Sequence, residues 1–350
     1  MKETNQVTKQ QTLPASGRKK WTTGKAIMTV VLALVLALSL FGCGTKEEPK
    51  GELSSPGKSA ASASPSASPS ASVKPAAAQT KYPLTIKDAS GVEVTFEKAP
   101  EKVVSLAPSE TEIIFSVGAG DKVIGVDKFS NFPEQAKSKP QVGDTNTNLE
   151  TLIGMAPDVV FANSINKKVV DKIRELNIKV FMGDPKTLDQ TIAHIEEIGT
   201  IMNKQDEGKK TADKMRADKQ KIVDDVKNAP KKKVYMEFNP GWTVGDGEFM
   251  DELVRLAGGE NVGAGKAGWY KIDSEAIIKK NPEIIVYSAG GNVKDTVLED
   301  IQKRPGWDQV DAVKNKKLVP INEDIVSRVG PRLTEALLEI AKAAHPDLVK

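Results

Sequence analysis

The residues whose types could recognise a ligand are aromatic and charged side chains in loops beside predicted strands. Flat rings suit a large planar ligand, and a carboxylate or a guanidinium suits its polar substituents. A single aromatic of this kind could equally cap a lobe core, as we expect for Trp307, but several at equivalent strand ends favour a site. The candidate ligand-binding residues are Phe132, Trp242, Trp269, Tyr270, Asp324 and Arg328.

Two glutamates occupy matching places in two copies of one sequence pattern, at 148–161 and 273–286. Each copy has a helix-capping residue, a glutamate two positions later, a proline seven residues after the glutamate and then an apolar strand. The helix dipole favours a glutamate in a first turn by roughly 0.3–1 kcal/mol, so neither glutamate needs a function. Because both copies carry it, Glu150 and Glu275 could instead lie one per lobe on a common rim and meet arginines of a dimeric membrane partner.

Recognised catalytic patterns are missing from the sequence. It has no phosphate-binding loop of the Walker type, no Gly-x-Ser-x-Gly elbow and no His-Glu-x-x-His pair. His194 and His345 lie far apart, and the single cysteine has no neighbouring metal-binding residue, so a zinc cluster is not expected. We therefore expect a protein that is not an enzyme and holds no metal or cofactor, with both histidines as surface or packing residues.

The N-terminal segment resembles a bacterial lipoprotein leader. A basic stretch ending at Lys25 precedes an uncharged apolar run at 26–41, which is short for a membrane span. The run ends in Leu-Phe-Gly-Cys, so 1–42 is predicted to be a signal peptide and Cys43 the lipidated first residue. An uncleaved membrane anchor is the alternative. A lipidated cysteine implies a location on the extracytoplasmic face of the cell membrane.

A tether rich in Ser, Ala and Pro follows the predicted anchor at 43–81. It has little apolar area to bury and would span roughly 35 Å as a coil, a spacer that points to a Gram-positive surface. The leader also accounts for the basic net charge. Residues 1–25 carry a net charge of +5 and the remaining residues carry about −2, which together give the formal net charge of +3. A nucleic-acid partner is therefore not expected.

The segment from 82 to 350 alternates short apolar runs with helical patterns, which predicts α/β lobes with mainly parallel sheets. A hairpin at 84–96, strands at 103–106, 123–126, 158–161 and 178–181, and a capping box at Ser109 and Glu112 place a first lobe at about 82–186. A charged amphipathic stretch at about 187–229 predicts a connecting helix that Gly208 could break. A second lobe at about 230–350 has strands near 234–238, 283–286 and 318–321 and helices near 248–257, 274–280, 294–302 and 332–344.

Five stretches of the folded part resemble the class III substrate-binding proteins of ABC importers for cobalamin, siderophores and haem. The resemblance covers roughly 82–350 and is nearest to the vitamin B12-binding members. It implies two lobes joined by one long helix, a ligand cleft between them with little closure, and a monomer that serves a permease dimer with its ATPase. The matching stretches are 104–112, 129–136, 148–150 with 157–160, 257–262 and 328–332.

The resemblance also implies roles for single residues. Aromatics at the positions of Phe132, Trp242 and Trp269 line the cleft, an acid at Asp324 lies near them, and Glu150 and Glu275 dock onto permease arginines. The B12 binders carry a further cleft tryptophan shortly before the first repeat, where this chain reads Gly-Asp-Thr-Asn-Thr-Asn at 143–148. We therefore expect a corrinoid ligand, with a ferric siderophore or haem as the alternative that Tyr270 and Arg328 keep open.

Overall fold

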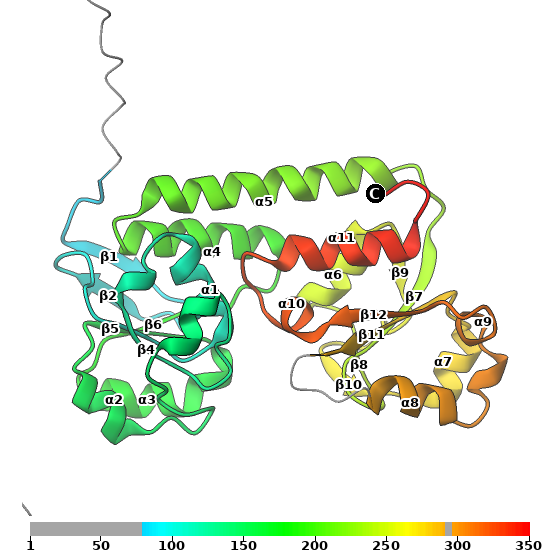
Figure 1. Ribbon diagram of the computed structural model, residues 1–350, viewed down its shortest axis with the longest axis horizontal. Helices are drawn as coiled ribbons and strands as arrows, with labels where there is room; N and C mark the ends of the chain where they lie inside the picture. The colour runs from blue at the N-terminus through cyan, green and yellow to red at the C-terminus, as the bar shows by residue number, and fades with distance from the viewer. Residues whose placement is uncertain (1–78, 291–295) are drawn as a thin grey trace, which may run out of the picture. The chain divides into compact units, whose positions relative to one another are not determined.

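The computed structural model describes residues 79–290 and 296–350, all within one compact unit (Figure 1). The predicted signal peptide, Cys43 and most of the tether fall outside these residues, as does the start of the helix predicted near 294–302. Within the two described ranges, no helix is both long and apolar enough to cross a bilayer.

A hairpin opens the described chain, as the alternating pattern predicts. Strands β1 (Leu84–Lys87) and β2 (Glu93–Phe96) pair in antiparallel fashion, with Leu84 opposite Phe96. The carboxylate of Asp88 accepts the backbone N–H groups of Ser90 and Val92 and so closes the turn. Its other oxygen lies 2.5 Å from a guanidinium nitrogen of Arg174, which ties the hairpin to the first lobe.

The first lobe is built on a parallel sheet of order β4-β3-β5-β6. Every residue of β3, β5 and β6 is buried, as expected for a parallel sheet with helices on its faces. All four strands were predicted. The elements are β3 (Val103–Ser105), α1 (Pro108–Ser116), β4 (Val123–Val126), α2 (Leu149–Met155), β5 (Val159–Ala162), α3 (Lys167–Glu175) and β6 (Val180–Met182).

The second lobe repeats this plan with a parallel sheet of order β12-β11-β7-β9. A two-stranded antiparallel ribbon of β8 and β10 lies beside it. The sequence analysis missed β8, β9 and β10, because each has three residues and none shows alternation long enough to signal a strand. The elements are β7 (Lys232–Glu237), β8 (Trp242–Val244), α6 (Phe249–Leu256), β9 (Gly259–Asn261), β10 (Trp269–Lys271), α7 (Ser274–Lys280), β11 (Ile284–Ala289), α8 (Thr296–Lys303), α9 (Asp311–Lys314), β12 (Leu318–Asn322), α10 (Glu323–Ser327) and α11 (Leu333–Ala344).

Two helices, α4 (Leu188–Ile201) and α5 (Gln205–Val226), lie side by side in antiparallel fashion, and α5 runs along both lobes (Figure 1). The chain turns at 202–204, where Asn203 has a φ of +55°, and not at Gly208 as predicted. Gly208 instead allows the helices to touch, because a Cβ built on it would lie 3.2 Å from the Cα of Gly199. The single long helix that joins the lobes is therefore α5, with α4 packed along it.

The capping box predicted at Ser109 and Glu112 is wrong. Helix α1 begins at Pro108, and its N-cap, Ala107, has no side chain that could accept a hydrogen bond. Proline suits a first helical position and starts the helix one residue early, so Ser109 lies inside it. Helix α4 does have a side-chain cap, since the Thr187 hydroxyl accepts the Gln190 N–H.

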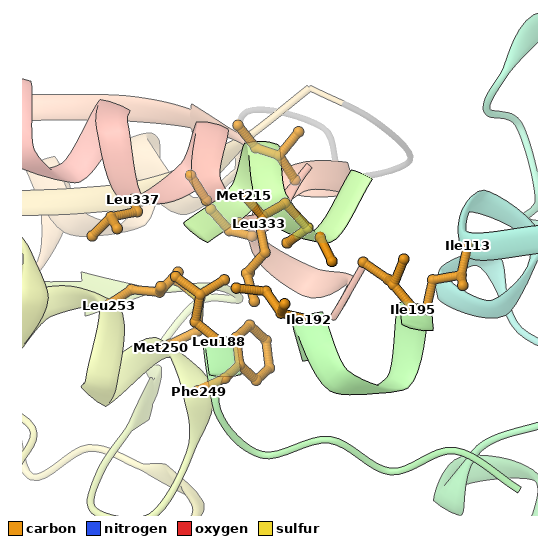
Figure 2. Close-up of a cluster of buried hydrophobic side chains, with 14 of the residues drawn as sticks. Ile113, Leu188, Ile192, Ile195, Met215, Phe249, Met250, Leu253, Leu333 and Leu337 are labelled. Carbon is orange, nitrogen blue, oxygen red and sulfur yellow. The ribbon is translucent and has the colours of Figure 1, made fainter. Parts of the chain in front are cut away.

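One apolar core runs through both lobes. Figure 2 shows side chains of α1, α4, α5, α6 and α11 converging on it. Each large aliphatic side chain buried there contributes about 1.5–3 kcal/mol, so opening the lobes would expose a costly surface. The labelled members are Ile113, Leu188, Ile192, Ile195, Met215, Phe249, Met250, Leu253, Leu333 and Leu337.

Candidate ligand cleft and docking helices

A cavity of about 600 Å³ lies between the lobes, at the carboxyl ends of the parallel strands. In open α/β sheets this edge is where ligands bind, because strand ends and helix starts leave polar groups free there. The first lobe lines the cavity with loops that follow β3, β4, β5 and β6. The second lobe lines it with the segment after β8, with β10 and with the segment after β12.

Trp269 is the predicted aromatic that lines the cleft. It is 41% exposed, and its ring meets the edge of Phe238 with 4.7 Å between centroids. Tyr270, the next residue of β10, does not line this cavity: its hydroxyl donates to the Gly263 carbonyl, and Lys266 lies over its ring. Neighbouring strand residues point to opposite faces, so β10 presents one ring to the cleft and the other to its own lobe.

Trp242 and Phe132 do not line the cavity, although both remain about half exposed. Trp242 stands on β8 opposite Lys271 of β10. The Phe132 ring stacks under the guanidinium of Arg332, with 4.1 Å from its central carbon to the ring centroid. From the same loop, Phe129 lines the cavity instead.

Arg328 reaches the cleft with most of its donors already used. It is buried, and its terminal nitrogens donate to Glu112 at 2.9 Å, Asn131 at 2.7 Å and Asp324 at 2.6 Å. The other Asp324 oxygen accepts from the Asn131 amide at 2.9 Å. Asp324 and Arg328, the two charged residues predicted to bind ligand, therefore bind each other and residues of the first lobe.

Glu112 is the centre of this interlobe network, which comprises Glu112, Asn131, Asp324, Arg328 and Arg332. Arg332 binds the Glu112 carboxylate with two hydrogen bonds, from Nε at 2.9 Å and Nη2 at 2.6 Å. Two guanidiniums thus bind one buried carboxylate, and the Arg332 pair is bidentate, a geometry that gives strong charge-assisted hydrogen bonds. The sequence pattern indicated only a capping role for Glu112.

A buried aspartate orders the loop that carries Phe129. The Asp127 carboxylate accepts the Phe129 N–H at 2.8 Å and a short hydrogen bond from the Ser130 hydroxyl. Burial raises the pKa of this carboxyl above its usual value, against the effect of these hydrogen bonds and of Arg328. Sequence reasoning missed Asp127, although it directly follows a predicted strand.

Several other lining residues were missed by the sequence analysis for a common reason. They lie within five residues after a predicted strand or at the start of a predicted helix, which is a usable signal, but single residues at such places are too frequent to select one by one. The missed lining residues include Phe129, Asn163, Ser164, Ile165, Asp184, Lys186, Glu248 and Phe249.

The two predicted rim helices have the same local structure. Asn148 caps α2 and Asp273 caps α7 through side-chain oxygens, and each helix has seven residues. Each ends in a left-handed residue before proline and a buried strand. Glu150 and Glu275 both lie exposed in the first turn, and neither forms an ion pair with any residue that the structure describes.

Metal-binding side chains do not gather in the described part of the chain, where no group of three His, Cys, Asp or Glu could hold an ion. Both histidines are buried packing residues. His194 is sandwiched between Glu110 at 3.0 Å and Glu197 at 3.1 Å, and His345 contacts the Gly258 carbonyl. Trp307 is buried as expected and donates to the Ser274 hydroxyl.

Comparisons with known proteins identify sequences similar to this chain. A family model described as periplasmic binding protein matches residues 103–325. An uncharacterised ABC transporter substrate-binding lipoprotein of Bacillus subtilis is 34% identical over 280 residues, 77% of this chain and 88% of that protein. A vitamin B12-binding protein of Yersinia pestis is 26% identical over 70% of this chain and 86% of its own length.

Solved structures share the fold. A possible iron-binding, periplasmic solute-binding protein of Staphylococcus epidermidis superposes with a TM-score of 0.63 and 30% identity, over 70% of this chain and 99% of that one. A periplasmic haem-binding protein of Pseudomonas aeruginosa gives 0.65 at 21% identity, over 72% and 94%. At the lower identity the likeness concerns the fold alone.

Proposed function

The chain belongs to the periplasmic binding protein family, and we propose from this membership that it captures cobalamin or a related corrinoid and delivers it to a permease. It is a substrate-binding protein of an ABC importer of the B12, siderophore and haem class, and it is not an enzyme. As such it binds a ligand and works with an ABC permease.

The chemistry of the cleft lining carries the corrinoid proposal. Trp269 and Phe129 offer flat apolar surface from opposite lobes, but no His, Tyr, Met or Cys side chain lines the cavity within the described residues. Proteins hold haem iron through such axial ligands. A cleft without them suits a chelate whose metal already has its ligands, as in a corrinoid. The vitamin B12-binding relatives support the same choice.

A ferric siderophore or haem is the second candidate. It is favoured by the Staphylococcus epidermidis structure, whose name gives iron as its possible ligand. Two residues that kept this option open have other partners here, since Tyr270 bonds within its lobe and Arg328 belongs to the interlobe network. This reduces the polar contacts that a charged siderophore would find.

We further propose that Glu150 and Glu275 dock onto a permease dimer that works with its ATPase, one glutamate on each half. Exposure, matching geometry and the lack of an ion-pair partner among the described residues support this. Segment 1–42 would be a signal peptide, 43–81 a lipidated tether and 82–350 a monomeric binding domain. The location is then the extracytoplasmic face of a membrane, and the Bacillus relative, named a lipoprotein, supports a Gram-positive source.

The ligand assignment can be tested by visible absorption. Protein exposed separately to cyanocobalamin, haem and ferric siderophores, then dialysed, should keep only the corrinoid spectrum. The Trp269→Ala variant serves as the control for binding outside the cleft and should lose most of the retained colour. Retention of haem or a siderophore without any corrinoid would transfer the assignment to the second candidate.

A further inference from the structure

A second cavity, of about 690 Å³, adjoins the ligand cleft on the first lobe. Ser164 and Ile165 line both cavities, so they form the border between them. Ile165 is 72% exposed, so the border lies at the surface and is not covered by other residues that the structure describes. A ligand in the cleft can therefore extend a substituent into the second cavity.

Three lysines line the second cavity, and none has an acidic partner. Lys167, Lys168 and Lys172 are exposed residues of α3, and within the described ranges no carboxylate pairs with them, including Asp171 and Glu175 of the same helix. Elsewhere lysines of this chain are paired along a helix. On α5 the lysines at 209, 214 and 221 each meet an aspartate four residues later.

The position of two of these lysines is unfavourable for the helix itself. Lys167 and Lys168 begin α3, whose first turn contains no acidic residue. The positive end of the helix dipole disfavours cations there by about 0.3–1 kcal/mol each. The Asn166 side chain does not cap α3, because it bonds to the Asn163 N–H and the Leu106 carbonyl and so takes part in the cap of the 3-10 turn Ser164–Asn166 that precedes α3. An anion bound in the cavity would offset the unfavourable interaction of the two lysines with the helix dipole.

The negative groups at the border are already occupied. Asp184 accepts the Ser164 hydroxyl at 2.6 Å and lies 3.3 Å from the Lys186 ammonium. Asp144 on the other side is paired with Lys128 at 2.6 Å. Neither of these two carboxylates is therefore free to pair with the three lysines.

We propose that Lys167, Lys168 and Lys172 form a subsite for an anionic substituent, a phosphodiester or a carboxylate, carried by the ligand in the cleft. The proposal rests on the proposed function, since it needs a ligand bound beside Trp269. Lysines act here as point charges on flexible stems, which suits a peripheral anionic group whose position varies between ligands. The subsite adds affinity for those ligands of the class that carry such a group.

The test compares ligand pairs of which one member carries an anionic group and the other does not. Cyanocobalamin has a phosphodiester that dicyanocobinamide lacks, and haemin has carboxylates that its dimethyl ester masks. Calorimetric titrations use the full-length protein and the triple variant Lys167→Ala/Lys168→Ala/Lys172→Ala. The matched control is Lys209→Ala/Lys214→Ala/Lys221→Ala, which removes the same charge from α5.

The cavity variant should lose about tenfold in affinity for the anionic member of whichever pair binds, and less than twofold for the other member. Its melting temperature should not fall, because alanine suits a helix and two unfavourable charges are removed. Equal losses for both members of a pair, or equal losses in both triple variants, would overturn the subsite. If the wild type binds none of the four compounds, the proposed function is overturned, and the subsite with it.

Discussion

The guanidinium of Arg328 in the second lobe donates a hydrogen bond of 2.9 Å to the carboxylate of Glu112 in the first. Both side chains are buried, and Arg332 binds the same carboxylate through two further hydrogen bonds. Together with the continuous core around α4, this contact holds the lobes at one spacing. We therefore expect recognition of a ligand to depend on the shape of a preformed cleft more than on closure.

Loss of the interlobe network should destabilise the fold strongly. Removing the partners of a buried charge costs about 3–5 kcal/mol when that charge stays buried without compensation. Both guanidiniums that bind Glu112 must be lost for this to happen, so the double variant Arg328→Ala/Arg332→Ala should lower the free energy of unfolding in urea by about this amount. The exposed pair of Arg216 with Glu196 provides the control, since Arg216→Ala should cost no more than about 1 kcal/mol. Similar losses in the two variants would mean that the network contributes no more than a surface ion pair.

Trp269→Ala should weaken ligand binding about tenfold or more. The ring supplies buried area, and stacking adds roughly 0.5–1.5 kcal/mol beyond that area, where about 1.4 kcal/mol is one decade. Calorimetric titration with cyanocobalamin measures the loss, and a melting curve checks the fold. Tyr270→Phe is the matched control on the same strand, because its hydroxyl bonds away from the cleft. Unchanged affinity with a large drop in melting temperature would place the Trp269 ring in a packing role.

The double variant Glu150→Gln/Glu275→Gln should bind ligand normally but support slower uptake. Glutamine keeps the size of each side chain and removes the charge that a permease arginine would meet. Each single variant should show an intermediate defect if the two lobes engage the two halves of the permease alike. Uptake at the wild-type rate in the double variant would leave both glutamates as partners of their helix dipoles only.

The ion pairs of His194 with Glu110 and Glu197 should make the fold less stable at high pH, where His194 loses its proton. Burial disfavours the imidazolium, but Glu110 and Glu197 outweigh that effect and raise the pKa of His194 from 6.5 to about 10. The unfolded chain releases this proton near pH 6.5 and the folded chain near pH 10, so the contribution is complete below pH 6.5 and declines between the two values. Urea unfolding at a series of pH values should show this decline in the wild type and a flatter profile in His194→Gln. A variant that kept the wild-type slope would assign the decline to other groups.

Cys43→Ala should abolish lipidation and release the protein from the membrane. The thiol of Cys43 is the only one in the sequence and so the only one that could take the lipid. Metabolic labelling with a radioactive fatty acid, followed by membrane fractionation, measures both effects. A labelled Cys43→Ala protein would show that the leader is not a lipoprotein signal.

The two rim helices show what local sequence determines. In both copies a short polar residue caps the helix, seven residues form it, and proline prevents its continuation before an apolar strand. These rules act over a few residues, so the positions of Glu150 and Glu275 follow from the order of amino acids alone. The same holds for the buried parallel strands, whose apolar runs between helical patterns predicted the fold class.

Tertiary structure decided the parts that depend on residues distant in the chain. Trp269 faces the cleft and Tyr270 faces away because β10 pairs with β8 in one register, and three residues are too few to reveal that register in the sequence. Glu112 resembled a helix cap until the fold placed it beside Arg328, 216 positions later. A buried carboxylate must find positive partners wherever packing brings them, and no local pattern records that requirement.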